Sequence, residues 1–222
     1  MATEPDTALD LFMDKYAELD RDTLSAGAVL LHAFASSRVA PVLAALEKVI
    51  QRSPFRFMTT PGGYRMSVAM TNCGATGWVT DRRGYRYDAL DPLSAARWPE
   101  MPPVFRELAV AAADAAGFAG FAPDACLINR YAPGARLSLH QDKNERDFNS
   151  PIVSVSLGLP AVFLFGGHCR AERPRRVPVA HADVVVWGGP ARLRFHGLQP
   201  LQNGRHPELG ACRVNLSFRK AR

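Results

Sequence analysis

The chain has 222 residues, of which 47% are apolar and 22% are charged. This length and balance suit one globular domain with a sizeable core, and they exclude disorder as the main state. The first ten residues carry three acidic side chains and no apolar stretch, so we expect no secretory signal. No apolar run approaches the roughly 20 residues needed to cross a bilayer, which predicts a cytoplasmic protein without a membrane partner.

The net charge bears on the kind of partner, and the spacing of the cysteines bears on their redox state. The formal net charge of +6 favours a polyanionic partner, because Lys and Arg that neutralise phosphates release counterions, although many basic proteins bind no nucleic acid. The four cysteines lie far apart without a CxxC pair, which predicts reduced thiols.

Residues 1–25 are mixed and polar and predict a flexible N-terminal arm, so we place a single domain at residues 26–222. Two segments of that domain have apolar residues at helical spacing. The first is 36–52, where Ser36 or Ser37 could cap the helix. The second begins at Pro102-Pro103 and stops at Gly117, the preferred kind of helix terminator.

Turn residues are frequent in residues 53–100, which predicts short strands and loops. From residue 122 to 222, short β-type runs follow one another with Gly and Pro between them. The expected strands are 126–131, 152–157, 162–165, 184–187, 192–196 and 212–218. This pattern predicts an α+β fold: a double-stranded β-helix, or jelly roll, flanked by the two helices.

The segment His140-Gln141-Asp142 is a candidate metal site. In a strand, side chains alternate between faces, so His140 and Asp142 would point the same way. A second imidazole from a distant strand would complete a two-His, one-carboxylate triad, which leaves positions on iron for a co-substrate and dioxygen. Taken alone, such a pair is more often structural, so the surrounding segments must decide.

His196 is the best third ligand, because it ends the expected strand 192–196 directly before Gly197. His181, at the start of a loop, and His206, in a turn-rich segment, are the alternatives.

Residues 213–219 alternate polar and apolar side chains without a break. One face carries Arg213, Asn215, Ser217 and Arg219. The two arginines could grip the two carboxylates of a short diacid such as 2-oxoglutarate, or they could simply lie in water. Asn129 and Tyr131 share a face of another expected strand and could donate hydrogen bonds to the same ligand.

These segments resemble the bacterial AlkB family of DNA repair dioxygenases. The resemblance runs from about residue 25 to the C-terminus and is carried mainly by residues 129–134, 140–142, 151–158 and 213–219. It implies that the iron ligands are His140, Asp142 and His196. It implies a 2-oxoglutarate site formed by Asn129, Tyr131, Arg213, Asn215 and Arg219, with Arg219 on the carboxylate that chelates iron.

The resemblance further implies that residues 53–100 form a nucleotide-recognition lid. Trp78 would stack on a flipped base, Tyr85 and Tyr87 would touch the neighbouring backbone, and Arg170 matches a substrate contact. A small satellite core is the alternative explanation for these aromatic residues.

One position departs from the family pattern. Asn144 stands where well-studied members have Asp in the substrate site. Because Asn both donates and accepts hydrogen bonds, the preferred base is left open.

The implied activity is oxidative demethylation of N-alkylated bases such as 1-methyladenine and 3-methylcytosine. Fe(II), 2-oxoglutarate and O2 take part, and formaldehyde is released. The expected partner is alkylated DNA, preferably single-stranded or with its base flipped, acted on by a monomer. RNA or a protein side chain is an alternative substrate, and an inactive jelly roll that only binds nucleic acid is the alternative from another class.

Overall fold

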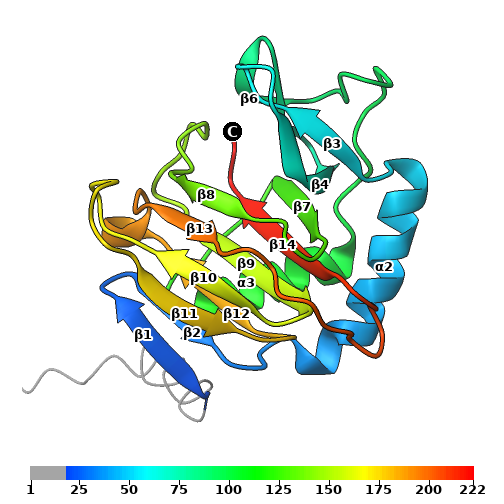
Figure 1. Cartoon of the computed structure of the whole chain (residues 1–222). Helices are drawn as coiled ribbons and strands as arrows, with labels where there is room; N and C mark the ends of the chain where they lie inside the picture. Colours follow the sequence, from blue (N-terminus) through cyan, green and yellow to red (C-terminus); the bar gives the residue numbers. More distant parts are fainter. Residues whose placement is uncertain (1–18) are drawn as a thin grey trace, which may run out of the picture.

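Two antiparallel β-sheets face each other in the computed structural model, which describes residues 19–222 (Figure 1). In spatial order, the larger sheet contains β1 (Arg21–Ser25), β2 (Ala28–Leu31), β12 (Val184–Trp187), β9 (Ile152–Gly158), β14 (Arg213–Arg219), β7 (Ala125–Tyr131), β4 (Arg65–Gly74) and β3 (Arg56–Thr59). The smaller sheet contains β11 (Arg175–Val179), β10 (Ala161–Phe165), β13 (His196–Leu198) and β8 (Leu137–His140). The predicted jelly roll is confirmed.

Both predicted helices are present, α2 (Val39–Arg52) and α3 (Pro103–Ala115), and they cover one face of the larger sheet (Figure 1). Leu46 of α2 and Phe105 of α3 belong to the same buried core as Ile128 of β7. The predicted serine cap is wrong. Ser36 and Ser37 instead form a short 3-10 turn, η1 (Ser36–Arg38), and neither caps α2 through its side chain.

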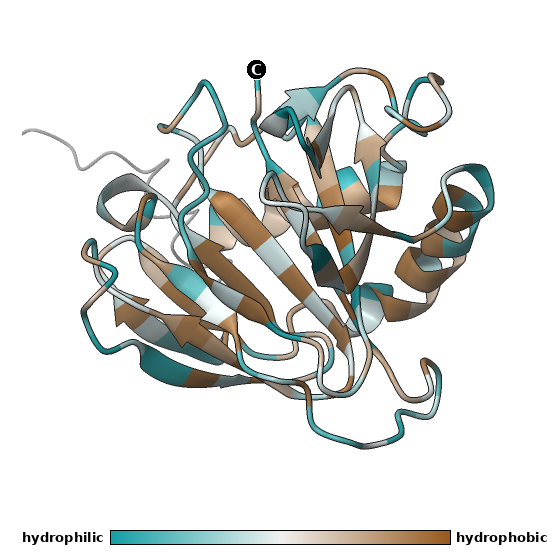
Figure 2. Cartoon of the chain, turned by 45° about the horizontal axis from the view of Figure 1, so that its top comes forward, coloured by the Kyte–Doolittle hydropathy of each residue, from teal (hydrophilic) through white to brown (hydrophobic). Residues whose placement is uncertain are grey.

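The central strands of the larger sheet are buried on both faces. Apolar and polar bands alternate along several strands (Figure 2), and on β14 Val214, Leu216 and Phe218 pack into the core beneath the helices. The opposite face of β14 carries the polar residues and turns toward the smaller sheet. All seven residues of β14 are buried, so its two arginines do not lie in water.

The segment predicted as a lid contains four strands. Strands β3 and β4 extend the larger sheet, while β5 (Gly77–Asp81) and β6 (Gly84–Asp88) pair only with each other, at the top of the molecule in Figure 1. Gly77 is required here, because a Cβ atom would lie 2.5 Å from the Trp98 ring. Trp98 also donates its indole N–H to the Asp88 carbonyl (2.9 Å), which fixes the base of this hairpin.

Two expectations need correction. The flexible arm predicted for residues 1–25 is wrong for its last five residues, because Arg21–Ser25 form β1 and pair with β2. The rest of the predicted arm falls mainly on residues 1–18, which lie outside the described residues. Residues 192–196 are not a strand. The chain turns through η2 (Gly189–Ala191) and on to residue 195, and His196 begins β13 instead of ending a strand. Within residues 19–222, no helix is long and apolar enough to cross a membrane.

Candidate metal and co-substrate site

Three predicted ligands meet between the two sheets. His140 ends β8 and is the direct partner of His196 on the neighbouring strand β13, while Asp142 follows just beyond the end of β8. The Asp142 carboxylate lies between the two rings, with one oxygen 3.6 Å from His140 Nε2 and the other 3.6 Å from His196 Nε2. The three groups could therefore hold one metal ion.

Backbone contacts orient both imidazoles for this task. His140 Nδ1 lies 2.8 Å from the Ser138 carbonyl and His196 Nδ1 lies 3.1 Å from the Arg194 carbonyl, so each Nδ1 carries the proton. Each Nε2 then offers a lone pair toward Asp142. Burial, and then repulsion from His196, lowers the pKa of His140 to about 4, which keeps that ring in the neutral form that binds metal.

The two alternative histidines, His181 and His206, form a second cluster with Glu208. In this cluster Nδ1 of each ring faces a backbone N–H, whereas Nδ1 of His140 and of His196 faces a carbonyl oxygen. His181 Nδ1 accepts the Gly158 backbone N–H (2.9 Å), and His206 Nδ1 accepts the Glu208 N–H (3.3 Å). Each neutral ring must therefore carry its proton on Nε2, where a metal would need a lone pair. The geometry favours His196 as the third ligand.

Arg219 lies directly behind the metal cluster. Its Nε and Nη2 atoms both donate to one Asp142 oxygen, at 2.9 Å and 2.5 Å. Burial alone would raise the pKa of Asp142, but Arg219 and then His196 hold it well below its ordinary value. Asp142 therefore stays a carboxylate.

Arg213 has the chemistry of a carboxylate site. Its Nη2 donates to Ser156 Oγ (2.9 Å), whereas its Nε and Nη1 atoms are buried without a partner, as is Asn129 Oδ1. Burial lowers the pKa of Arg213 to about 10, so it is still protonated at neutral pH. Unpaired N–H groups on a buried cation are rare and fit a missing anionic ligand, which a carboxylate of 2-oxoglutarate would supply.

One cavity of about 960 Å³ joins these groups to the lid. Trp78 and Tyr85 stack on each other at its outer end, with ring centroids 5.7 Å apart. The predicted site residues that line it are Trp78, Tyr85, Asn129, Tyr131, His140, Asp142, Asn144, Arg170, His196, Arg213, Asn215 and Arg219. The structure thus brings the predicted metal, co-substrate and base-contact residues to one space.

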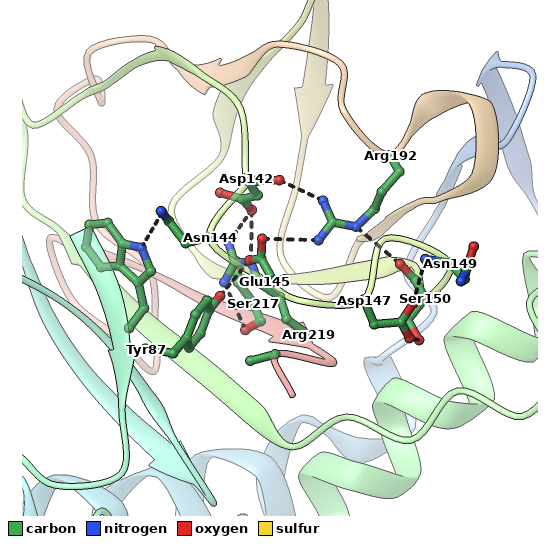
Figure 3. A network of polar contacts seen from close by, with 12 residues as sticks. Tyr87, Asp142, Asn144, Glu145, Asp147, Asn149, Ser150, Arg192, Ser217 and Arg219 are labelled. Atoms are coloured by element: carbon green, nitrogen blue, oxygen red, sulfur yellow. Dashed lines mark hydrogen bonds and ion pairs between the residues drawn. The ribbon is translucent and has the colours of Figure 1, made fainter. Parts of the chain in front are cut away.

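Tyr87 is the exception among the predicted residues, because it does not line this cavity. Its hydroxyl donates to Glu145 (2.6 Å), on the same segment as Asp142 (Figure 3). Burial, ahead of the neighbouring charges, raises the pKa of Tyr87 well above its ordinary value. Its predicted contact with a nucleotide backbone stays a prediction.

Sequence reasoning missed two buried residues of this site, Glu145 and Arg192. Arg192 donates to the Asp142 carbonyl (2.9 Å) and to the Ser150 carbonyl (3.2 Å), and its guanidinium lies 3.3 Å from Glu145. Both side chains are only 2% exposed. The closeness of Glu145 to Asp142 in the sequence was the one available signal, since nothing in the pattern around Arg192 separates it from a solvated arginine.

Comparisons with known proteins agree with this geometry. Residues 27–219 match the family described as the 2OG-Fe(II) oxygenase superfamily. The chain is 56% identical over 213 residues to the alpha-ketoglutarate-dependent dioxygenase AlkB of Escherichia coli (strain K12), covering 96% of this chain and 98% of that protein. It is 32% identical over 162 residues to the tRNA demethylase abh1 of Schizosaccharomyces pombe, covering 65% of this chain and 52% of that protein. The solved structure of OsALKBH1 superposes with a TM-score of 0.80 at 28% identity, over 90% of this chain and 100% of that one.

Proposed function

The chain belongs to the AlkB family of the 2OG-Fe(II) oxygenase superfamily, and on this premise we propose that it oxidatively demethylates N-alkylated bases such as 1-methyladenine and 3-methylcytosine in DNA. It is an Fe(II)- and 2-oxoglutarate-dependent dioxygenase. The observation that carries the proposal is the continuous cavity, which runs from the metal cluster to the stacked Trp78 and Tyr85. Residues 53–100 act as the nucleotide-recognition lid.

Each group has a distinct task in this proposal. His140, Asp142 and His196 hold the iron, and Arg213 and Arg219 bind the two carboxylates of 2-oxoglutarate. When bound, iron, co-substrate and dioxygen supply the oxidising chemistry, and the methyl group leaves as formaldehyde. The protein orients the base and limits competing reactions.

The outer part of the cavity suits a methylated base. Trp78 and His140 line the same cavity, and a positively charged methylated ring would be attracted to the face of the Trp78 indole. The Trp78 indole N–H points to Asn144 Oδ1 at 3.4 Å, which leaves the Asn144 amide group free to donate to the base edge. An Asp at that position could only accept, so base preference depends on this residue.

We also propose that single strands are preferred and that the enzyme acts as a monomer. A base in a duplex must leave its stack before it reaches the cavity, at a cost of a few kcal/mol that single strands avoid. The four free cysteines support a reducing compartment, as expected for a cytoplasmic protein.

Formaldehyde and succinate release should be measured with a panel of oligonucleotides that carry 1-methyladenine or 3-methylcytosine, as single strands, as duplexes and as RNA. We expect the two products in equal amounts, with methylated single-stranded DNA as the best substrate. Higher turnover of the RNA panel would replace DNA with RNA as the substrate, an alternative that the similarity to a tRNA demethylase favours. Absence of formaldehyde with every oligonucleotide, alongside turnover of a methyl-lysine peptide, would contradict the proposal.

A further inference from the structure

We infer that Glu145 is a positioning residue that links the placement of the lid to Arg219, through the hydroxyl of Tyr87. This inference rests on the proposed function, because it assumes that a nucleotide binds against the lid. In this inference, Tyr87 and Glu145 act on the site without needing to touch the nucleotide themselves.

The link consists of two contacts at one oxygen atom. Tyr87 donates its hydroxyl to Glu145 Oε1 at 2.6 Å, and Arg219 Nε lies 3.3 Å from the same oxygen (Figure 3). Arg219 in turn donates to Asp142. A single carboxylate thus joins the lid hairpin β5–β6 to the arginine behind the metal cluster.

Because the Glu145 carboxylate is buried, the loss or displacement of one of its charged partners is costly. Glu145 and Arg192 are 2% exposed, Arg219 is 7% exposed and Asp142 is 12% exposed, so two acids and two arginines balance each other almost out of water. The other Glu145 oxygen is held 3.3 Å from Arg192, which also binds the Asp142 carbonyl. Removal of one partner from such a set leaves a buried charge uncompensated, so the remaining groups must shift.

The outer end of the link is the proposed base contact. Trp78 and Tyr87 are directly opposed on β5 and β6, so a base that moves Trp78 also moves Tyr87. Tyr87 then changes its hydrogen bond to Glu145 and, with it, the placement of Arg219. Coupling of this kind is reciprocal: 2-oxoglutarate on Arg219 must change the affinity for the methylated base by the same factor as the base changes the affinity for 2-oxoglutarate.

The test measures that factor directly as binding, without turnover. The Kd of a single-stranded 1-methyladenine oligonucleotide is measured with and without 2-oxoglutarate, with Mn(II) in place of iron and without oxygen. We expect 2-oxoglutarate to tighten binding about fivefold or more in the natural chain. In Tyr87→Phe, which keeps the ring and removes only the hydroxyl, the ratio of the two Kd values should fall to about one.

Arg86→Gln is the matched control. Arg86 is a neighbour of Tyr87 on β6, and its ion pair with Asp81 (2.9 Å) lies within the hairpin. This variant weakens the hairpin without touching the link, so it should keep the natural ratio. Glu145→Gln should behave like Tyr87→Phe, and its melting temperature shows whether it folds.

Three results would overturn the inference. The first is a natural chain whose two Kd values are equal, and the second is a Tyr87→Phe protein that keeps the natural ratio. The third is an equal loss of the ratio in Arg86→Gln, because it would trace the effect to a loosened hairpin. Failure of the natural chain to bind the methylated oligonucleotide at all would overturn the proposed function as well. The other three results would overturn the inference alone, so the two kinds of failure can be told apart.

Discussion

Arg213 and Arg219 lie on the same face of β14 but have opposite electrostatic surroundings. Arg219 contacts the carboxylates of Asp142 and Glu145, which raise its pKa above the ordinary value despite its burial. Arg213 has no carboxylate within ion-pair distance among residues 19–222, and burial lowers its pKa. One arginine therefore completes the protein's own charge balance, while the other lacks an anion.

This difference predicts opposite effects on stability. Arg213→Gln should raise the Kd for 2-oxoglutarate at least about tenfold and leave the free energy of unfolding of the unliganded protein unchanged or higher, because a buried unpaired charge is removed. Arg219→Gln should lower that free energy by about 3 kcal/mol or more, because the buried Asp142 carboxylate loses its arginine and Glu145 keeps only Arg192 and the Tyr87 hydroxyl. Calorimetric titration and urea denaturation measure both quantities. Equal destabilisation by the two substitutions would contradict this assignment.

The orientation of the rings predicts which histidine binds metal. His196→Ala should abolish Mn(II) binding in equilibrium dialysis, whereas His206→Ala should leave it unchanged, because the Nε2 atom of His206 carries a proton. Retention of Mn(II) by His196→Ala would transfer the assignment to the second cluster.

His181 makes the fold sensitive to acid. Burial, and then His206, lowers the pKa of His181 below its ordinary value, so the unfolded chain binds this proton more readily than the folded one. Stability is therefore fully present above the unfolded-state pKa and falls as the pH drops through it. His181→Asn can still accept the Gly158 N–H through Oδ1 but cannot titrate, so its melting temperature should fall less between pH 7.5 and pH 5. An identical fall in both proteins would contradict the role of His181.

Residue patterns predicted the parts of the site that repeat along one strand. The alternation on 213–219 placed its polar residues on one face. The predicted meeting of His140 and Asp142 is confirmed, although β8 ends at His140 and Asp142 lies just beyond it and not on the same strand. Glu145, Arg192 and the contact of Tyr87 were not predictable, because each depends on a partner from a distant element. A buried ion pair leaves no periodic trace in a sequence, since both of its residues usually lie in water.

At the scale of elements, the apolar patterns were sufficient for the helices and the central strands. The prediction failed at residues 192–196, where the buried guanidinium of Arg192 holds the chain in a turn by hydrogen bonds to two distant carbonyl groups. Strand β1 was missed because its residues are largely exposed and polar, and its pairing with β2 defines it. Tertiary contacts decided the structure in both segments.

Helix α2 should contribute strongly to stability through its buried face. Leu46 is 3% exposed in the core between α2, α3 and the larger sheet, so Leu46→Ala should lower the free energy of unfolding by about 2–5 kcal/mol. Urea denaturation measures this loss. Glu47→Ala, at the exposed neighbouring position, serves as the control and should change it by less than about 0.5 kcal/mol. A loss of less than about 0.5 kcal/mol in Leu46→Ala would show that α2 does not support the sheet.

At the scale of the whole molecule, the net charge of +6 should govern how oligonucleotides bind. The logarithm of the affinity should fall linearly with the logarithm of the salt concentration, because Lys and Arg that neutralise phosphates release condensed counterions into solution. Arg170→Gln, at the wall of the cavity, should reduce that slope by about one, whereas Arg106→Gln, exposed on α3, should not change it. Fluorescence anisotropy over a range of salt concentrations tests this, and equal slopes in all three proteins would exclude a phosphate contact by Arg170.

The β5–β6 hairpin shares no backbone hydrogen-bond ladder with either large sheet. Mutations in it can therefore accumulate without changing the register of the strands that carry the histidines and arginines of the proposed iron and 2-oxoglutarate site. A chimaera that takes this hairpin from a relative with another preferred base, but retains Tyr87, should acquire the donor's preference and keep its own affinity for 2-oxoglutarate. Substrate choice and oxidising power are thus separately evolvable in this chain.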